Sequence, residues 1–351
     1  MIHEPGPPIL TIVLPVFGVQ RLLGECLDSI LSFPGKEIEV VAVDDASPDR
    51  SGEILDLRAA GDPRLRVIHL PVNGGLGSAR NAGLDSGTGQ YVWFVDGDDW
   101  LPEGSIEVVI DRLALHHPDV LIVDHMERLS DGRSVSRGTK EILGKFQTPL
   151  RLADKPELMR LAHSACTKVV RRAFLDELKL RFHDGLYEDA VFSHHLLMAA
   201  EVIDVLERHC YNYRLQTGGS ITTSRNARHF EVFDQYERLF EIVAAAGGGY
   251  DIFRPELFRA MLNHYLVILG NPRRLLPSMR REFFARMVRD YRRFLPPQGF
   301  AHQTGVAGLK QRLVERNAYA AYASLRLAYR LRPRAAVIPR QRPATSKASP
   351  A

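Results

Sequence analysis

The sequence predicts an α/β fold: a mainly parallel, mixed sheet flanked by helices, followed by a helical C-terminal region. Apolar, β-rich runs start at residues 9, 38, 65, 91 and 119, at intervals of 29, 27, 26 and 28 residues. Such intervals fit one strand plus one crossover helix. Apolar residues also recur at helical spacing between the runs. From about residue 130 the alternation stops, and helical periodicity dominates.

The elements of the first third follow in order from these patterns. We expect buried strands in five runs, which are Ile9–Leu14, Ile38–Val43, Leu65–Leu70, the run from Tyr91, and Asp119–Val123. Helical spacing between the first two runs is carried by Leu23, Cys26, Leu27, Ile30 and Leu31. The same spacing after the fourth run is carried by Ile106, Val109, Ile110 and Leu113. Strands and helices therefore alternate along this part of the chain.

The C-terminal part is predicted to be helical and then disordered. Residues 228–300 resemble amphipathic helices with breaks near 244–249 and 295–298, and residues 307–332 form one further candidate helix. After Pro333 the Pro, Ala and Arg content indicates disorder. We therefore predict a sheet domain at 8–225, a helical accessory region at 226–332 and a basic tail at 333–351.

The composition is that of an ordinary globular protein, with 351 residues, 45% of them hydrophobic and 25% charged. No apolar run is long enough to cross a bilayer, and the first residues lack a signal-peptide pattern. The cysteines Cys26, Cys166 and Cys210 form neither a disulfide framework nor a zinc spacing, which fits a reducing compartment. We therefore expect a cytoplasmic location.

The net charge of +4 conceals a basic tail. Residues 316–351 contain eight Lys or Arg and no Asp or Glu, which leaves 46 − 8 = 38 basic against 42 acidic side chains before them. The tail either holds the protein at the inner face of an anionic membrane or on a polyanionic acceptor, or is only a solubilising segment. Nucleic acid is not an expected partner, because no recognisable binding fold accompanies the tail.

Polar clusters follow three of the predicted strands. They are Asp44 and Asp45, the loop Asn73–Gly77, and the segment Asp96–Asp99. In an open parallel sheet, ligands bind beyond the carboxyl ends of the strands, where loops and helix N-termini converge. The three clusters therefore outline one cleft.

The acidic segment predicts a metal site. Asp96 and Asp98 are separated by one glycine, so that both can reach one cation and leave positions for diphosphate oxygens. Mg²⁺ or Mn²⁺ with a nucleoside diphosphate is the natural occupant, since hard cations prefer oxygen ligands. The alternative is a plain turn that caps a helix starting near Pro102, and Asp99 is a candidate for such a structural role.

The glycine loop suits an anionic ligand. Gly75 and Gly77 allow close approach of the backbone before a helix that starts near Ser78, and helix N-termini carry unpaired amide donors. Arg80 replaces the third glycine of a dinucleotide fingerprint, so a nicotinamide-dependent enzyme is not expected. Arg80 would instead neutralise an anionic ligand or the nearby carboxylates. A plain strand-to-helix turn is the alternative.

Together, these motifs resemble the family 2 glycosyltransferases, which have the GT-A fold. The resemblance covers residues 8 to about 222 and is carried by linked segments, which are Leu14–Phe17, Val43–Asp49, Gly77–Gly83, Val95–Asp99, Tyr187–Asp189 and Tyr211–Ile221. It implies transfer of a sugar from a nucleoside-diphosphate donor with inversion at the anomeric carbon.

The resemblance also implies roles for single residues. Pro15 and Phe17 would line the nucleotide pocket, Asp45 would hydrogen-bond the base, and Gly75 would lie in the donor-binding loop. Arg80 would sit beside the diphosphate, and Asp96 and Asp98 would hold the metal. Asp189 would be the general base, and Glu188 would tune or position it. A carboxylate in that role fits the chemistry, because a sugar hydroxyl is a poor nucleophile until its proton is accepted.

Three functions remain open from the sequence. The first is sugar transfer to a hydroxyl of a cell-envelope glycan, polymer or lipid-linked acceptor. The second is a catalytically silent nucleotide-sugar-binding or scaffold protein. The third, a nucleotidyltransferase, lacks support because no glycine-rich, basic loop directly follows the first strand.

Overall fold

The computed structural model describes residues 6–136, 148–160, 164–215 and 225–331. The chain up to Ala301 forms one compact unit, and the chain from His302 onward forms a second. The predicted division at residue 225 stays a prediction. The predicted basic tail, 333–351, lies outside the described residues, as does the end of the motif that starts at Tyr211.

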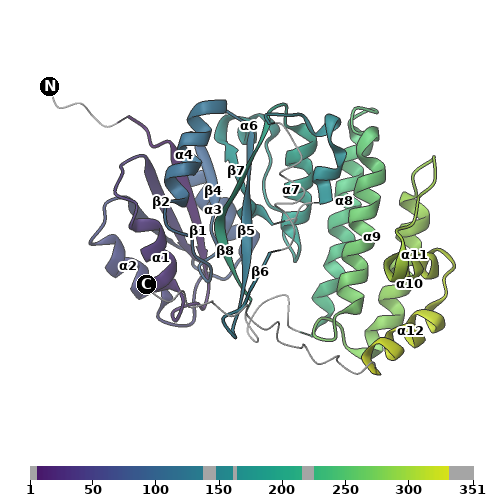
Figure 1. The fold of residues 1–351 in the computed structure, drawn as a ribbon. Helices are drawn as coiled ribbons and strands as arrows, with labels where there is room; N and C mark the ends of the chain where they lie inside the picture. The colour runs from purple at the N-terminus through teal and green to yellow at the C-terminus, as the bar shows by residue number, and fades with distance from the viewer. Residues whose placement is uncertain (1–5, 137–147, 161–163, 216–224, 332–351) are drawn as a thin grey trace, which may run out of the picture. The chain divides into compact units, whose positions relative to one another are not determined.

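One mixed sheet of eight strands forms the centre of the first unit (Figure 1). Its strands are β1 (Leu10–Val16), β2 (Ile38–Asp44), β3 (Leu65–His69), β4 (Tyr91–Phe94), β5 (Val120–Leu129), β6 (Ser134–Val135), β7 (Lys168–Arg171) and β8 (Ile203–Leu215). They lie in the order β3-β2-β1-β4-β7-β5-β6, and β8 pairs with β5. The strands β1 to β4 are parallel, whereas β7 runs antiparallel between β4 and β5. The predicted fold class is confirmed.

The central strands are buried on both faces, as their continuous apolar runs predict. All seven residues of β1 and all four of β4 are buried. Trp93 in β4 is fully buried, and its indole nitrogen donates a hydrogen bond to the carbonyl oxygen of Cys166 at 2.8 Å. This contact ties β4 to the segment that leads into β7.

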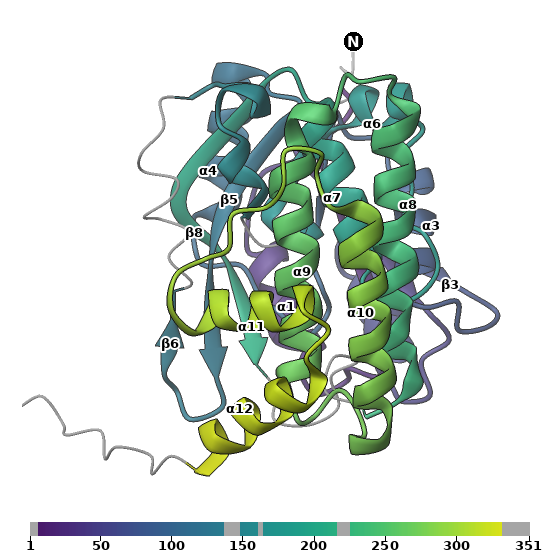
Figure 2. The ribbon, with the colours of Figure 1, turned by 90° about the vertical axis from the view of Figure 1, so that its right-hand side faces the viewer.

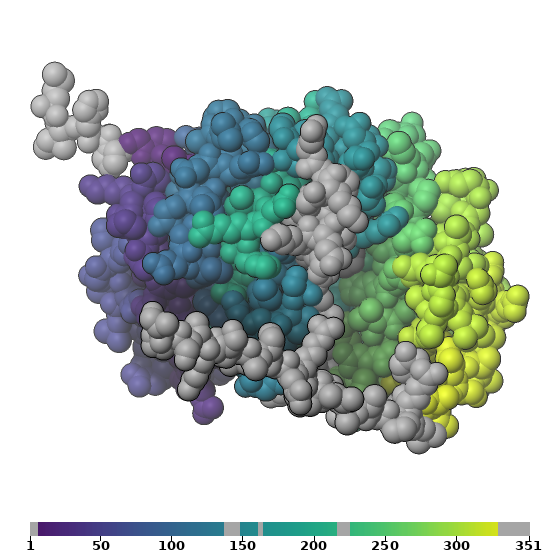
Figure 3. Space-filling view, viewed as in Figure 1, coloured from purple at the N-terminus to yellow at the C-terminus, as the bar shows by residue number. Residues whose placement is uncertain are grey.

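Helices cover the sheet in the first unit. They are α1 (Leu23–Leu31), α2 (Ser51–Ala59), α3 (Leu76–Ser86), α4 (Ser105–His116), α6 (Arg172–Leu178), α7 (Glu188–Ala199), α8 (Glu231–Ala245), α9 (Arg254–Gly270) and α10 (Arg280–Phe294). Figure 1 shows α7 between the sheet and α8, and Figure 2 shows α8, α9 and α10 as a layer of long helices. In the space-filling view of Figure 3, the surface passes from purple and blue sheet-domain residues through teal to the green of these helices.

The second unit contains α11 (Gly305–Glu315) and α12 (Tyr319–Leu331). The predicted single helix at 307–332 was therefore wrong. Asn317 lies between the two helices with a positive φ of 51°, a conformation that a continuing right-handed helix does not allow. No helix within the described ranges combines the length and hydropathy that a membrane span requires.

Three strands were not predicted from the sequence, and one of them, β6, has only two residues. β7 has only four residues, Lys168–Arg171, and is too short to show a period. The thirteen residues of β8 include Glu207, Arg208 and His209, which interrupt its apolar pattern near a register shift opposite Asp124. Sheet pairing overrides such local patterns, because the strand face is set by its neighbours.

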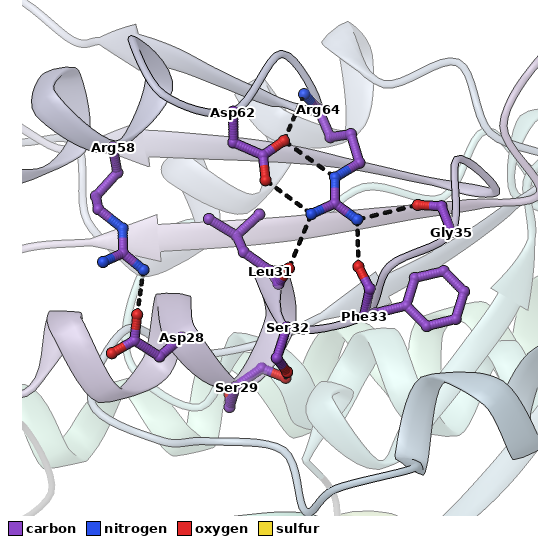
Figure 4. Close-up of polar contacts among 9 residues, drawn as sticks. All are labelled: Asp28, Ser29, Leu31, Ser32, Phe33, Gly35, Arg58, Asp62 and Arg64. Atoms are coloured by element: carbon purple, nitrogen blue, oxygen red, sulfur yellow. Dashed lines mark hydrogen bonds and ion pairs between the residues drawn. The ribbon is translucent and has the colours of Figure 1, made fainter.

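Arg64 joins the loop before β3 to the C-terminal end of α1 (Figure 4). Its guanidinium donates to the carbonyl oxygens of Leu31 at 2.8 Å, Gly35 at 3.0 Å and Phe33, and it pairs with Asp62 at 2.7 Å. The last carbonyls of a helix lack partners within the helix, and a cation is favourable there. Arg64 therefore closes the end of α1 that lies away from the polar strand ends.

Candidate active site

A cavity of about 990 Å³ opens at the carboxyl ends of β1, β2 and β4. All nine predicted site residues border it, and they are Pro15, Phe17, Asp45, Gly75, Arg80, Asp96, Asp98, Glu188 and Asp189. The strand ends and helix α3 bring the first seven together, and the start of α7 adds the last two. The predicted cleft therefore exists, whereas the role of each residue stays a prediction.

The three carboxylates after β4 lie in two different environments. Asp96 and Asp98 border the cavity, but Asp99 is buried and does not. The carboxylate of Asp99 accepts hydrogen bonds from the hydroxyl of Tyr211 and from the backbone N–H of Arg214, both at 2.7 Å. Asp99 thus fastens the end of β8 to the acidic segment. The alternative of a helix cap was wrong, because α4 begins only at Ser105 after Gly104, with no side-chain cap.

Arg80, on α3, contacts both Asp96 and Glu188. It is 2% exposed. Its guanidinium donates to Asp96 Oδ1 at 2.9 Å and to Glu188 Oε1 at 2.8 Å. Burial works against its charge, but Asp96 and the other acidic groups around it raise the pKa of Arg80 well above its usual value. The predicted contact with nearby carboxylates is present, and the predicted place beside a diphosphate stays a prediction.

Glu188 and Asp189 are the first two residues of α7. Burial and then repulsion from Asp189 raise the pKa of Glu188 to about 7, against the attraction of Arg80. Burial also raises the pKa of Asp189, whereas Arg80 and Lys168 oppose the rise. Raised carboxyl pKa values near neutrality are typical of proton-transfer sites. The pair can accept a proton from a ligand in the cavity.

Lys168 is a cation that the sequence did not assign. It lies at the start of β7, is 1% exposed, and donates to the carbonyl oxygen of Ser164 at 2.9 Å. Burial lowers the pKa of Lys168 to about 8, while the charge of Asp189 opposes the change. Lys168 therefore supplies positive charge behind Asp189.

The glycine loop is held by a carboxylate. Asp45 is 3% exposed, and its two oxygens accept the backbone N–H groups of Gly74 at 2.7 Å and Gly75 at 2.9 Å. Gly75 has a φ of 86°, which favours glycine, and α3 starts directly after it at Leu76. Two of the amides expected to meet an anionic ligand are thus satisfied by Asp45, and this carboxylate shapes the loop. Its contact with a base stays a prediction.

The residues beside the cavity fit a hard divalent cation. Asp96 and Asp98 offer oxygen ligands, and Mg²⁺ is often held by one or two carboxylates plus substrate phosphates. Burial raises the pKa of Asp99 well above its usual value, and the negative charges of Asp98 and Asp96 add to the rise. No group of three or more His, Cys, Asp or Glu able to hold a metal occurs among the described residues. Diphosphate oxygens would have to complete the coordination.

Sequence reasoning gave no role to several cavity residues, although Tyr187 and Tyr213 lie within segments that carry the family resemblance. The cavity residues without a predicted role are His125 and Glu127 on β5, Ser164 and Thr167 before β7, Tyr187 before α7, Tyr213 on β8, and Arg228 before α8. Tyr211 is another, and its hydroxyl accepts the N–H of Asp96 at 3.2 Å while it donates to Asp99. The segment that starts at Tyr211 was recognised as a motif, but nothing in it indicated which partner each tyrosine would meet.

The sequence is similar to known glycosyltransferases. The family model described as Glycosyl transferase family 2 matches residues 11–178. The uncharacterized glycosyltransferase EpsJ of Bacillus subtilis (strain 168) is 32% identical over 218 residues, 59% of this chain and 61% of that protein. The poly(ribitol-phosphate) beta-N-acetylglucosaminyltransferase TarS of Staphylococcus aureus (strain Mu50) is 29% identical over 220 residues, 61% of this chain and 37% of that protein. The chain thus spans less than two thirds of either relative.

A solved structure extends the likeness to almost the whole chain. The crystal structure of S. aureus TarS 1-349 in complex with UDP-GlcNAc superposes with a TM-score of 0.69 at 20% identity. The match covers 92% of this chain and 91% of that one, and it concerns the fold alone. The family match and the motifs within it place residues 11–178 of this chain in glycosyl transferase family 2.

Proposed function

We propose that this protein is a metal-dependent, inverting glycosyltransferase. It would move a sugar from a nucleoside-diphosphate donor to a hydroxyl of a cell-envelope glycan, polymer or lipid-linked acceptor. The observation that carries the proposal is the convergence of Asp96 and Asp98, the cation Arg80, and the pair Glu188–Asp189 on one cavity. Donor, leaving-group and proton-acceptor positions are thereby available in one place.

The relatives favour a UDP-sugar donor and an envelope polymer as acceptor. TarS is named as a transferase of N-acetylglucosamine to poly(ribitol phosphate), and one of its structures contains UDP-GlcNAc. At 29% identity or less this is a guide to the first substrates to test. UDP-GlcNAc is therefore our first candidate donor.

The proposed reaction has one displacement step. The acceptor hydroxyl attacks the anomeric carbon from the face opposite the diphosphate, and Asp189 takes its proton as the new C–O bond forms. The bond from the anomeric carbon to the diphosphate oxygen breaks, and its electron pair leaves with the diphosphate. Burial and the neighbouring charge of Asp189 raise the pKa of Glu188, so the two adjacent carboxyl groups resist carrying two negative charges together.

The residues of the acidic segment act on the leaving group. Asp96 and Asp98 would hold a Mn²⁺ or Mg²⁺ ion, which when bound offsets the charge that gathers on the diphosphate. Arg80 is buried, cationic and fixed by two carboxylates, so it contributes positive charge there without reorganising.

A donor panel tests this proposal. Binding and hydrolysis of UDP-, GDP-, CDP- and TDP-sugars would be measured with Mn²⁺, with Mg²⁺ and after chelation, for the wild type, Asp98→Ala, and Asp111→Ala as an exposed control on α4. We expect turnover of one donor, UDP-GlcNAc first, that needs the metal, is lost by at least about tenfold in Asp98→Ala and is kept in the control. Absence of binding to every donor would refute the proposal.

A further inference from the structure

The turn that leads into α7 adopts an unusual backbone. Tyr187 immediately precedes Glu188 and has a left-handed conformation, with φ 68° and ψ 24°. Gly185, two residues earlier, has a φ of 103°. A bulky residue with positive φ is rare and persists only where its surroundings hold it. The contacts around Tyr187 should therefore show what holds this turn.

The start of α8 and the turn before it hold one side. The hydroxyl of Tyr187 lies 2.7 Å from Nδ1 of the fully buried His229. Glu231 accepts the N–H of Leu186 at 2.6 Å, and Gln235 donates to the carbonyl oxygen of Asp184 at 2.9 Å. Residues 229–235 thus make three hydrogen bonds with the turn.

Residues of the α9 region enclose the ring of Tyr187. His264 on α9 packs edge-on against it, with 4.8 Å between ring centroids. Arg274, which follows α9, places its guanidinium 5.8 Å from the ring centroid. The ring is therefore fixed by aromatic and cation–π contacts in addition to the hydrogen bond.

Helix α3 holds the other side. Asn81 donates to the carbonyl oxygen of Phe182 and accepts its N–H, each at 2.9 Å. Gly77 packs so closely that a Cβ there would lie 2.9 Å from the carbonyl oxygen of His183. The turn is thus held between α3 on one side and the α8 and α9 regions on the other.

We propose that Tyr187 is a positioning residue for Glu188 and Asp189. Through its bond to His229 it fixes the turn whose next two residues carry the carboxylates, so the helical segment 226–301 helps to build the site. The proposal rests on the proposed sugar transfer. A displacement of about 1 Å at reacting groups can cost on the order of 10²-fold in rate, so a lost hydroxyl here should be visible in catalysis.

Tyr187→Phe removes only the hydroxyl and keeps the ring. We expect kcat for transfer to fall about tenfold or more, with the donor Kd within about twofold of the wild-type value. Tyr250→Phe is the matched control, because the hydroxyl of Tyr250 makes no hydrogen bond in the part of the chain that the structure describes, and it should leave kcat unchanged. His229→Asn, which keeps a polar group near the position of Nδ1, should retain more kcat than His229→Ala.

A second readout does not depend on activity. Amide hydrogen exchange of residues 186–190 should accelerate in Tyr187→Phe and His229→Ala, while exchange in β4 stays as in the wild type. Unchanged kcat and exchange in Tyr187→Phe would overturn the proposal, and so would a donor Kd that weakens in proportion to kcat. A wild type without transfer would refute the proposed function, and the exchange measurement would still decide the role of Tyr187.

Discussion

Charge balance around Asp189 decides how this residue can act. The carboxylate lies beside Glu188, and the cations Arg80 and Lys168 oppose the rise of its pKa. Arg80 is already shared between Asp96 and Glu188. The ammonium of Lys168 donates hydrogen bonds to Ser164 and Thr167. Its positive charge also acts on Asp189 and opposes the rise of the pKa of that carboxyl group.

Replacing Lys168 by Met tests this balance. The positive charge favours the carboxylate form of Asp189, so its loss should raise the pKa of Asp189 further. Because the base must be deprotonated, activity is lost as the pH falls through that pKa, and the acidic limb of kcat/KM should move to higher pH. The pH–rate profile measures it. Lys36→Met, at an exposed lysine, should leave the limb in place, and an unmoved limb in Lys168→Met would contradict the argument.

The residues that border the cavity could be predicted from the sequence, but their hydrogen-bond partners could not. The acidic segment, the glycine loop and the Glu188–Asp189 pair were all identified, and all border one cavity. The engagement of Asp45 with the loop amides and of Asp99 with Tyr211 depends on contacts 29 to 112 residues apart. Local patterns carry no information about such contacts.

At the scale of elements, the turn before α7 is the most constrained connection of the site. Gly185 meets α8 so closely that a Cβ there would lie 3.1 Å from Glu231 Oε2 and 3.2 Å from Gln235 Nε2. Its φ of 103° is also unfavourable for any residue with a side chain. A side chain at Gly185 would therefore meet both a steric clash with α8 and an unfavourable backbone conformation.

Gly185→Ala should lower the free energy of unfolding by about 1–3 kcal/mol. Gly132→Ala is the control: Gly132 has a φ of 82° but open space around its Cβ position, so it carries the backbone cost of about 1 kcal/mol alone. Urea denaturation compares the two. A Gly185→Ala variant no less stable than Gly132→Ala would show that α8 does not restrict this turn.

Strong periodicity located the elements of the first third. β1 to β5, α1 and α4 lie where apolar runs and helical spacing predict them. The strands β6, β7 and β8 were missed, because β6 has two residues, β7 has four and the middle of β8 is charged. Helical periodicity after residue 225 predicted helices but not which residues they would contact. The contacts of these helices with Tyr187 could therefore not be predicted.

At the scale of the whole molecule, the family match and the fold match differ in extent. The family model ends at residue 178, before the Glu188–Asp189 pair, whereas the structural likeness covers 92% of the chain. The contacts of α3 and α8 with the same turn join the two regions within the first unit. Under the proposed function, one cavity completed by the start of α7 would transfer a sugar with Asp189 as the base.

Asp189→Asn removes the proposed base and keeps a side chain of nearly the same size. Transfer from UDP-GlcNAc to envelope polymers, poly(ribitol phosphate) among them, and the donor Kd would be measured for the wild type, Asp189→Asn and the exposed control Asp111→Asn. We predict wild-type donor affinity in all three proteins and a loss of transfer of about 10²-fold or more in Asp189→Asn alone, the usual contribution of a general base. Transfer by Asp189→Asn at a rate near that of the wild type would show that Asp189 is not the base.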